Sequence, residues 1–204
     1  MTKIKLCGLR RYCDIEVANE LLPDFIGFVF VPKSKRYVTY EEALTLRAKL
    51  DKRITPVGVF VNETLENIET FVKKDIIRIV QLHGTEDNAY IRALKSKVDC
   101  PVIQAFRIES KEDVDRAEKS EADYIMLDSG GGMGTTFDHS LIKNINRDFF
   151  LAGGLTADNV QQAIFKYQPY AVDASSSLEI GGVKDKEKMT AFMRAVRNGK
   201  EEGK

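Results

Sequence analysis

Cysteine and histidine are scarce in this chain of 204 residues, and neither sign of charge is in surplus. It has three cysteines and two histidines, and no two cysteines have C-x-x-C spacing. So few thiols, odd in number, favour free cysteines in a reducing compartment over a disulfide framework. No cysteines, histidines and acids stand at metal-ligand spacing. We therefore expect a cytoplasmic protein that needs no metal.

A surplus of positive charge is also missing, since 31 Lys and Arg balance 31 Asp and Glu. Nucleic acids and anionic membranes favour a basic surplus, so the balance argues against both partners. No apolar run approaches the roughly 20 residues that span a bilayer. Residues 1–3 lead directly into the first apolar segment, without the architecture of a signal peptide. The length and the 43% hydrophobic content suit one globular domain.

Eight short apolar runs are present, and a polar or amphipathic stretch follows each of them. The runs are rich in Val, Ile and Phe without clean alternation, which is typical of strands buried on both faces. They begin at Ile4, Phe25, Pro56, Ile77, Pro101, Tyr124, Phe149 and Tyr170. Capping-box pairs at Thr39 with Glu42 and at Ser110 with Asp113 predict helix starts between them.

Eight strand–helix units predict an α/β fold, a single-domain (β/α)8 TIM barrel over residues 1–197. A polar tail over residues 198–204 follows. The helix expected over 138–145 is the weakest, with two turns at most. A doubly wound open sheet is the alternative fold. A leucine-rich solenoid does not fit, because the runs lack its Leu and Asn ladder.

Function in such a barrel sits at the carboxyl ends of the strands. Polar and small residues concentrate directly after the eight runs, which a purely structural barrel would not need. The residues are Cys7, Gly8, Arg36, Asn62, His83, Arg107, Asp128, Gly153, Gly154, Asp173 and 175–177.

Two of these residues, Cys7 and Asp128, have groups suited to proton transfer. Cys7 ends the first run and is followed by glycine, so it is either a small buried hydrophobic residue or a thiol that acts as base or nucleophile. Asp128 is either a loop or cap aspartate, or a carboxylic acid held protonated in a dry barrel mouth. The glycines after Asp128 suggest a loop that closes on a ligand.

Arg36 and His83 are candidates for binding rather than chemistry. Arg36 lies in a loop with three cations within four residues, which is either a solvated charge run or an anion contact for which guanidinium suits a carboxylate. His83 has no second ligand at metal spacing, so a structural histidine is the alternative to a substrate contact.

The last two strand ends predict a phosphate site. Gly153 and Gly154 separate the seventh run from a helix start, while Asp173 and the serines 175–177 follow the eighth run. Freed backbone N–H groups and hydroxyl donors form a cradle for an anion. Phosphate sites recur after strands seven and eight of these barrels, although each loop alone could be a structural turn.

Several motifs together resemble the phosphoribosylanthranilate isomerase family of tryptophan biosynthesis. They occur in matching order and spacing from Lys3 to about Phe192. The motifs are K-L-C-G, G-F-V-F-V-P-K-S-K-R-Y, V-G-V-F-V-N, V-Q-L-H-G, L-D-S-G-G-G-M-G-T-T-F-D, L-A-G-G-L-T-A-D-N-V and A-V-D-A-S-S-S-L-E with G-G-V-K-D.

The resemblance implies a TIM-barrel enzyme without metal or cofactor. It implies that N-(5-phosphoribosyl)anthranilate becomes 1-(2-carboxyphenylamino)-1-deoxyribulose 5-phosphate by an Amadori rearrangement. The family's base falls on Cys7, its acid on Asp128 and its carboxylate-binding arginine on Arg36. Its phosphate loops fall on Gly153 with Gly154 and on Ser175 with Ser176, and we add His83 and Asp173 as substrate contacts. We expect a monomer, with a dimer as the alternative.

The chain departs from the family pattern at four positions. Ser177 stands where glycine is usual and narrows the allowed φ beside the phosphate. Met133 replaces a small hydroxyl residue, His139 a tryptophan and Ala157 a proline. These changes put loop rigidity and phosphate affinity in doubt more than the reaction type.

One non-catalytic function and two other phosphosugar enzymes are the alternatives to this function. A non-catalytic phosphosugar-binding barrel would not need both Cys7 and Asp128. A ribulose-phosphate epimerase would need more metal-ligating histidines than two. The related histidine-pathway isomerase would carry aspartates at the ends of strands one and five, where this chain has Cys7 and Arg107.

Overall fold

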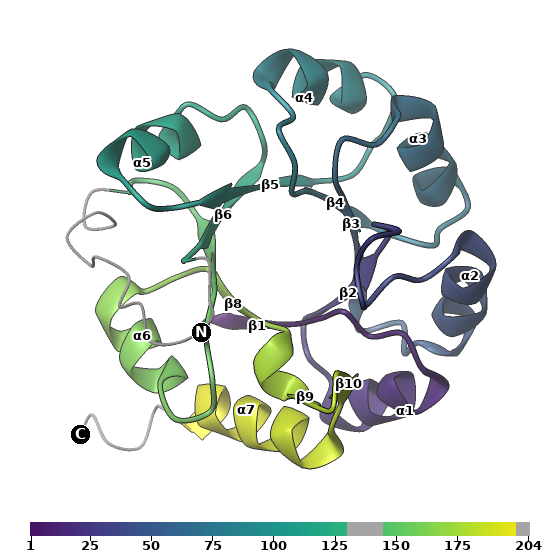
Figure 1. Cartoon of the computed structure of the whole chain (residues 1–204), viewed down its shortest axis with the longest axis vertical. Helices are drawn as coiled ribbons and strands as arrows, with labels where there is room; N and C mark the ends of the chain where they lie inside the picture. The colour runs from purple at the N-terminus through teal and green to yellow at the C-terminus, as the bar shows by residue number, and fades with distance from the viewer. Residues whose placement is uncertain (130–144, 199–204) are drawn as a thin grey trace.

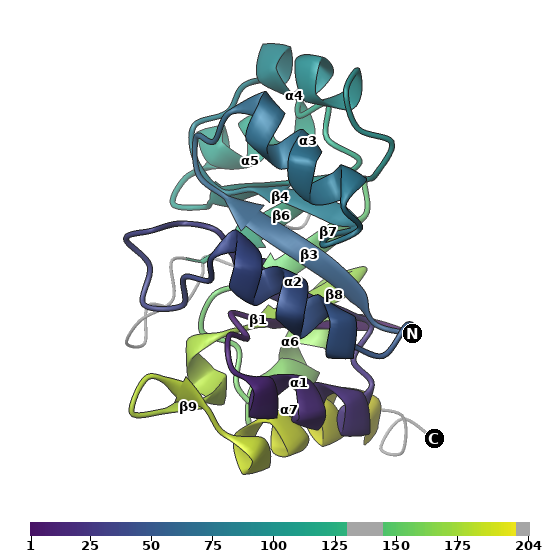
Figure 2. The same cartoon turned by 90° about the vertical axis from the view of Figure 1, so that its right-hand side faces the viewer.

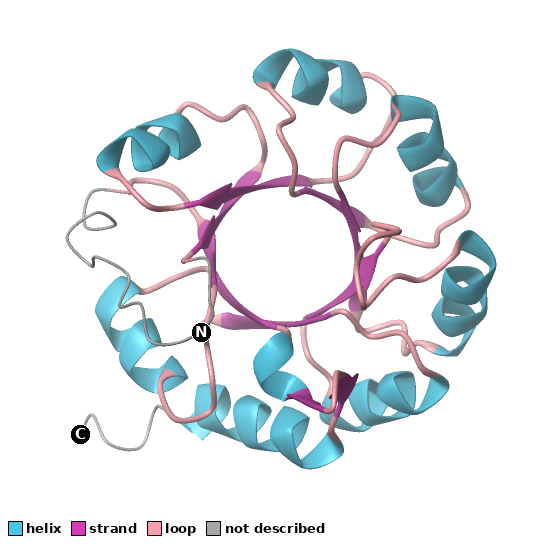
Figure 3. Cartoon of the chain, in the orientation of Figure 1, coloured by secondary structure: helices cyan, strands magenta, loops and turns pink. Residues whose placement is uncertain are grey.

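Eight parallel strands, in sequence order, close into a barrel in the computed structural model, which describes residues 1–129 and 145–198. Figure 1 looks down this barrel, and Figure 3 separates the inner ring of strands from the surrounding helices. The barrel strands are β1 (Lys3–Cys7), β2 (Phe25–Val29), β3 (Thr55–Phe60), β4 (Ile79–Leu82), β5 (Val102–Arg107), β6 (Tyr124–Asp128), β7 (Phe149–Ala152) and β8 (Ala171–Ala174).

The described residues also form seven α-helices outside the barrel. These are α1 (Tyr12–Leu21), α2 (Tyr40–Lys49), α3 (Leu65–Lys73), α4 (Asn88–Lys95), α5 (Lys111–Glu118), α6 (Val160–Tyr167) and α7 (Lys186–Asn198). After β8 the chain makes a short 3-10 helix, η1 (Ser176–Leu178), and a two-stranded hairpin of β9 (Glu179–Ile180) and β10 (Val183–Lys184). The sequence patterns did not predict this hairpin.

The expected (β/α)8 barrel is confirmed, and each of the eight apolar runs overlaps one of its strands. An open doubly wound sheet is wrong for this chain, because β1 pairs with β8 and closes the ring. The helix expected over 138–145 falls almost wholly in residues 130–144, outside the described residues. Helix α7 continues through Asn198, and residues 199–204 of the expected tail are not described.

Two helices begin where the capping boxes were expected. At α2, the Thr39 side chain accepts a hydrogen bond from the Glu42 backbone N–H, and the Glu42 carboxylate accepts one from the Thr39 N–H at 2.7 Å. Ser110 and Asp113 make the same reciprocal pair at α5. Each pair satisfies backbone donors that have no partner within the helix.

Side chains alternate between the inside and the outside of the barrel. On β1, Ile4 and Leu6 belong to the core between strands and helices, whereas Lys5 and Cys7 face the interior. Apolar side chains from most other strands fill that interior. They are Phe25, Val57, Ile79, Ile103, Ala105, Met126, Phe150, Ala152 and Ala171. The barrel is thus a packed core rather than a pore, and only its mouth is open to a ligand.

The carboxyl ends of the strands gather the segments that form the site. Figure 2 shows the loop between β2 and α2 and the β9 hairpin at the same end of the barrel, opposite the N-terminus. Of the described helices, none combines the length and the apolar character needed to cross a membrane.

Phe150 provides a test of the packed interior. Its ring is fully buried against Phe25, Tyr124 and Tyr170, with centroids 5.5, 5.7 and 5.7 Å away. We expect Phe150→Ala to lower the free energy of unfolding by about 3–5 kcal/mol, because a large cavity remains. Phe165→Ala removes a ring that is 87% exposed, and we expect a change within about 0.5 kcal/mol. Urea denaturation of both variants measures the difference, and equal losses would contradict the packed interior.

Candidate active site

A cavity of about 380 Å³ opens at the carboxyl ends of the barrel strands. Its wall includes ends of strands on opposite sides of the barrel, the loop before α2, and the start of η1. Of the strand-end residues noted in the sequence, Gly8, Asn62 and Arg107 do not line it. All nine residues assigned to catalysis or substrate binding do. They are Cys7, Arg36, His83, Asp128, Gly153, Gly154, Asp173, Ser175 and Ser176.

Cys7 is the last residue of β1 and is buried at the base of the cavity. A Cβ atom on Gly27 of the neighbouring β2 would lie 2.6 Å from Cys7 Sγ, so the absent side chain leaves room for the thiol. Ser175 Oγ donates a hydrogen bond to the Cys7 carbonyl at 3.0 Å. Burial raises the pKa of the Cys7 thiol, and the nearby Lys5 ammonium offsets this only in part.

Lys5 and Asp173 form an ion pair directly below the cavity. Lys5 Nζ donates to Asp173 Oδ1 at 2.9 Å, and the lysine side chain has no exposed area. Burial alone would lower the pKa of Lys5, but Asp173 and Cys7 together outweigh burial and raise it. The sequence analysis named Asp173 but not Lys5. A lysine at an inward position of an apolar strand was the signal available for it.

Asp128 and His83 face each other across the mouth, with His83 Nε2 3.7 Å from Asp128 Oδ2. Gln81 Nε2 lies 3.1 Å from His83 Nδ1. Because an amide nitrogen only donates, Nδ1 accepts and the neutral ring carries its proton on Nε2, toward Asp128. Gln81 Oε1 is buried without a hydrogen-bond partner among the described residues, and Gln81 lines the cavity. Sequence analysis missed Gln81.

Arg36 forms a bidentate ion pair with Glu179, the first residue of β9. Its Nε and Nη2 donate to the two carboxylate oxygens at 2.6 and 2.8 Å. Lys184 of β10 donates to the same carboxylate at 2.5 Å and to the Ser175 carbonyl at 2.9 Å. The two cations outweigh the burial of Glu179 and lower its pKa, whereas burial lowers the pKa of Lys184. The three charges sum to one positive charge at the cavity wall.

Glycine is required where Arg36 passes over the end of β1. Gly8 has φ +80, and a Cβ there would lie 2.3 Å from Arg36 Cδ. The arginine stem thus packs on the backbone next to Cys7. The pair with Glu179 uses Nε and Nη2 of Arg36, which leaves Nη1 outside this pair, on a residue that lines the cavity. Glu179 and Lys184 were not singled out from the sequence, since their roles depend on the hairpin.

The loop after β7 also depends on glycine. Gly153 and Gly154 have φ +91 and +62. A Cβ on Gly153 would lie 2.2 Å from Ser129 Oγ and 2.7 Å from Asp128 Oδ1. Glycine therefore lets this loop approach the Asp128 carboxylate directly, and both backbone conformations favour glycine.

The serines after β8 complete this side of the cavity. Ser175 follows β8, and Ser176 and Ser177 begin η1. Ser177, which stands where glycine is usual in the family, does not have a positive φ, so serine can adopt this backbone conformation. The departures at Met133 and His139, and the glycines expected to close over the site, lie in 130–144, outside the described residues.

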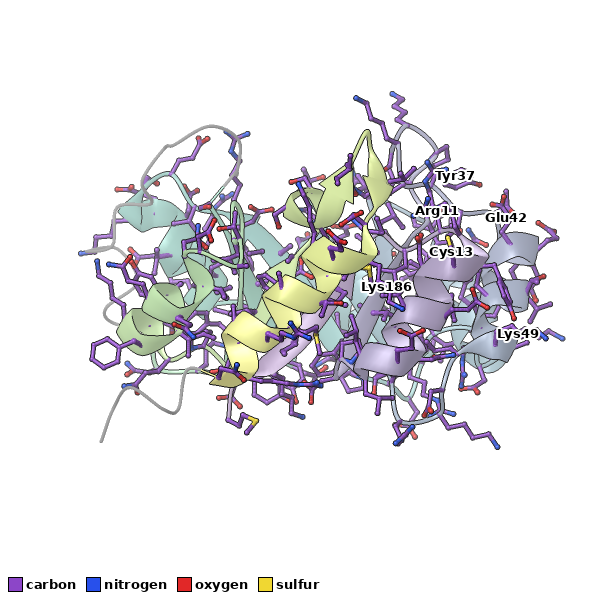
Figure 4. The ribbon with its side chains drawn as sticks, turned by 90° about the horizontal axis from the view of Figure 1, so that it is seen from below. Arg11, Cys13, Tyr37, Glu42, Lys49 and Lys186 are labelled. Carbon is purple, nitrogen blue, oxygen red and sulfur yellow. The ribbon has the colours of Figure 1, made fainter. Side chains whose placement is uncertain are left out.

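No group of three His, Cys, Asp or Glu side chains suited to a metal ion occurs within residues 1–129 and 145–198. Cys13 lies on α1, on the outside of the barrel, as Figure 4 shows. It is exposed, and Cys100 is partly exposed, so Cys7 is the buried thiol of the three.

Comparison with known proteins identifies the family. The family model described as N-(5'phosphoribosyl)anthranilate (PRA) isomerase matches residues 4–195. An N-(5'-phosphoribosyl)anthranilate isomerase from Thermoanaerobacter sp. (strain X514) is 44% identical, covering 97% of this chain and 98% of its own.

Solved structures indicate the same family. Phosphoribosyl anthranilate isomerase from Thermotoga maritima superposes with a TM-score of 0.90 at 36% identity, covering 97% of this chain and all of its own. A phosphoribosyl anthranilate isomerase in complex with reduced 1-(o-carboxyphenylamino)-1-deoxyribulose 5-phosphate has a TM-score of 0.87 at 35% identity, with the same coverage. The chain therefore belongs to the N-(5'-phosphoribosyl)anthranilate isomerase family.

Proposed function

We propose that this isomerase of tryptophan biosynthesis uses Cys7 as general base and Asp128 as general acid on N-(5'-phosphoribosyl)anthranilate. The observation that carries the proposal is that both side chains line one cavity, together with Arg36 and the glycine loop after β7. Their strands, β1 and β6, are separated around the ring by β7 and β8. A substrate lying between them can therefore receive a proton on one side and lose one on the other.

Asp128 acts first. As the C1′–O4′ bond of the furanose breaks, the anthranilate nitrogen lone pair forms the C=N bond of an iminium ion. The ring oxygen leaves with that bonding pair and takes the proton of the Asp128 carboxylic acid. His83 lies beside this carboxyl group with an N–H at Nε2, so it can donate to Asp128 once the proton has gone.

Cys7 acts second. Its thiolate takes the proton from C2′, and the C–H electron pair forms the C1′=C2′ bond while the iminium nitrogen recovers its lone pair. The resulting enolamine then tautomerises to the ketone of the product. The cationic nitrogen acidifies the C2′ proton, so a modest base is sufficient.

Other groups around the cavity bind the parts of the substrate that do not react. The phosphate binds between the loop of Gly153 and Gly154 and the serines Ser175 and Ser176, where backbone and hydroxyl donors surround an anion. The anthranilate carboxylate binds Arg36 through donors that Glu179 leaves unused. Gln81 Oε1, buried and without a partner among the described residues, accepts from a sugar hydroxyl.

Replacing the base gives the first test of the reaction. We expect Cys7→Ser to lower kcat by roughly 10²–10⁴-fold, because a hydroxyl ionises far less readily than a thiol. Binding of the reduced product analogue should persist. Cys13→Ser is the matched control, since this thiol is exposed on α1 and should be dispensable. Wild-type kcat in Cys7→Ala would rule out Cys7 as the base.

Replacing the acid should stall ring opening. Asp128→Asn keeps the shape but cannot donate an equivalent proton, so we expect kcat to fall by roughly 10²–10⁴-fold. Asp115→Asn, at an exposed position of α5, should leave kcat unchanged. Steady-state kinetics of both variants decides the assignment. A loss below about threefold in Asp128→Asn would show that another group protonates the ring oxygen.

Substitutions at Arg36 and in the phosphate loop should weaken the binding of different ligands. We expect Arg36→Ala to weaken the reduced product analogue roughly 10- to 100-fold, the ~1.5–3 kcal/mol of a hydrogen bond to a charged group. Inorganic phosphate should bind as before. Gly154→Ala should weaken both ligands. Gly181→Ala is its control, because Gly181 has nearly the same φ, +59, with open space at its Cβ.

Calorimetric titration of the three variants with both ligands separates these outcomes. If Arg36→Ala abolishes phosphate binding and Gly154→Ala spares it, the substrate lies in the opposite orientation. If Gly181→Ala weakens phosphate as much as Gly154→Ala does, the loss reflects backbone strain rather than the cradle.

A further inference from the structure

Lys5 is the most deeply buried charged side chain whose place the proposed reaction does not explain. It lies inside the barrel on β1, with no exposed area. A buried lysine loses its hydration and its rotamer freedom, so an apolar residue of similar volume is often equal or better for stability. The barrel interior below the mouth is otherwise packed with aliphatic and aromatic side chains. Packing alone therefore does not account for a charge at this position.

The position of Lys5 is fixed from two sides. Lys5 and Asp173 are directly paired residues of β1 and β8, and their side chains meet at 2.9 Å. Asp173 is itself buried, so the ion pair is shielded from water and salt. The ammonium consequently has little freedom to move.

Cys7 stands two residues further along the same strand and faces the same interior. Both side chains point inward from alternate positions of β1, which places the Lys5 ammonium near the thiol. Its attraction for a thiolate offsets part of the burial cost. A base in a dry cavity needs such a partner, because an isolated buried thiolate is strongly disfavoured. The same burial that raises the pKa of Cys7 makes the nearby cation effective.

We propose that Lys5 is a positioning residue, held by Asp173, which places a fixed cation beside Cys7 Sγ and so makes the thiolate accessible for proton abstraction. The inference rests on the proposed role of Cys7 as base. Lys5 itself does not touch the substrate, since it lies below the residues that line the cavity.

Other charged groups also face Cys7, and each has a defined direction of effect. Asp173 on β8 disfavours the thiolate, whereas Lys184 on β10 favours it. Arg36, in the loop after β2, is a further cation that interacts with the thiol. Asp128 on β6 and His83, directly after β4, act on Asp173 from across the mouth. Lys5 has the strongest effect on the thiol of these charged neighbours.

The test measures the thiolate directly. The rate at which iodoacetamide alkylates Cys7, followed by peptide mass spectrometry against pH, reports its ionisation. Cys13 in the same molecule serves as an exposed internal reference. Lys5→Met removes the cation but leaves Asp173 without its partner and so threatens the fold. The double variant Lys5→Met/Asp173→Asn removes both charges, which buried pairs generally tolerate.

We expect the alkylation profile of Cys7 in the double variant to move to higher pH, by less than the roughly 1 to 3 units that one opposite charge contributes, because losing Asp173 offsets part of the loss of Lys5. At pH 7, kcat should fall about tenfold for each unit of that shift. The single variant Lys5→Arg keeps the positive charge, so it should retain part of the wild-type alkylation profile and part of the wild-type kcat. Lys3→Met is the matched control on the same strand, since Lys3 Nζ lies over Tyr170, 4.9 Å from the ring centroid, and its profile should be unchanged.

A wild-type alkylation profile in the double variant overturns the proposal, whatever its turnover. A profile that Lys3→Met moves equally far also overturns it, since the effect would then not be specific to Lys5. The alkylation readout does not require Cys7 to be the base. Activity retained in Cys7→Ser would therefore reject the proposed reaction separately, without deciding whether Lys5 stabilises the thiolate.

Discussion

The parallel pairing of β1 with β8 closes the barrel, and the contacts that shape the site cross this seam. Lys5 meets Asp173, and Ser175 Oγ meets the Cys7 carbonyl, each between residues 168 apart in sequence. The bidentate pair of Arg36 with Glu179 spans the same side of the mouth. A small opening of this seam would separate Lys5 from Asp173, which holds the ammonium in place below Cys7 on the same strand. Strand pairing and the chemistry of the thiol therefore depend on one constraint.

The hairpin after β8 ties the mouth to the outer layer of helices. Glu179 and Lys184 stand opposite each other on β9 and β10, and both take part in the charge cluster with Arg36. Arg11, just before α1, donates to the Lys184 carbonyl. A short two-stranded element thus connects the substrate-binding arginine with the first helix. Its ion pairs are partly buried, which makes them less sensitive to salt than surface pairs.

The sequence predicted the strands and the cavity residues well, because buried parallel strands leave unbroken apolar runs and a barrel places their ends together. It could not predict that Arg36 pairs with Glu179, 143 residues away, since nothing local specifies such a contact. The hairpin strands have two residues each, too few for a periodic pattern. Sequence analysis did not identify Lys5 for a different reason. Its role depends on which strand pairs with β1, and that strand, β8, is the last barrel strand in the chain.

The seam also constrains the order in which the protein can fold. Until residues 171–174 are available, β1 has one unpaired edge, and exposed strand edges favour association with other chains. Closing the ring joins the two barrel strands that are most distant in sequence. The entropic cost of closing this long loop is therefore incurred late in folding. During synthesis from the N-terminus, Cys7 therefore emerges among the first residues but acquires its surroundings among the last. Helices α1 and α2, already present, can pack on the outer face of β1 and β2 and protect the growing half-barrel in the meantime.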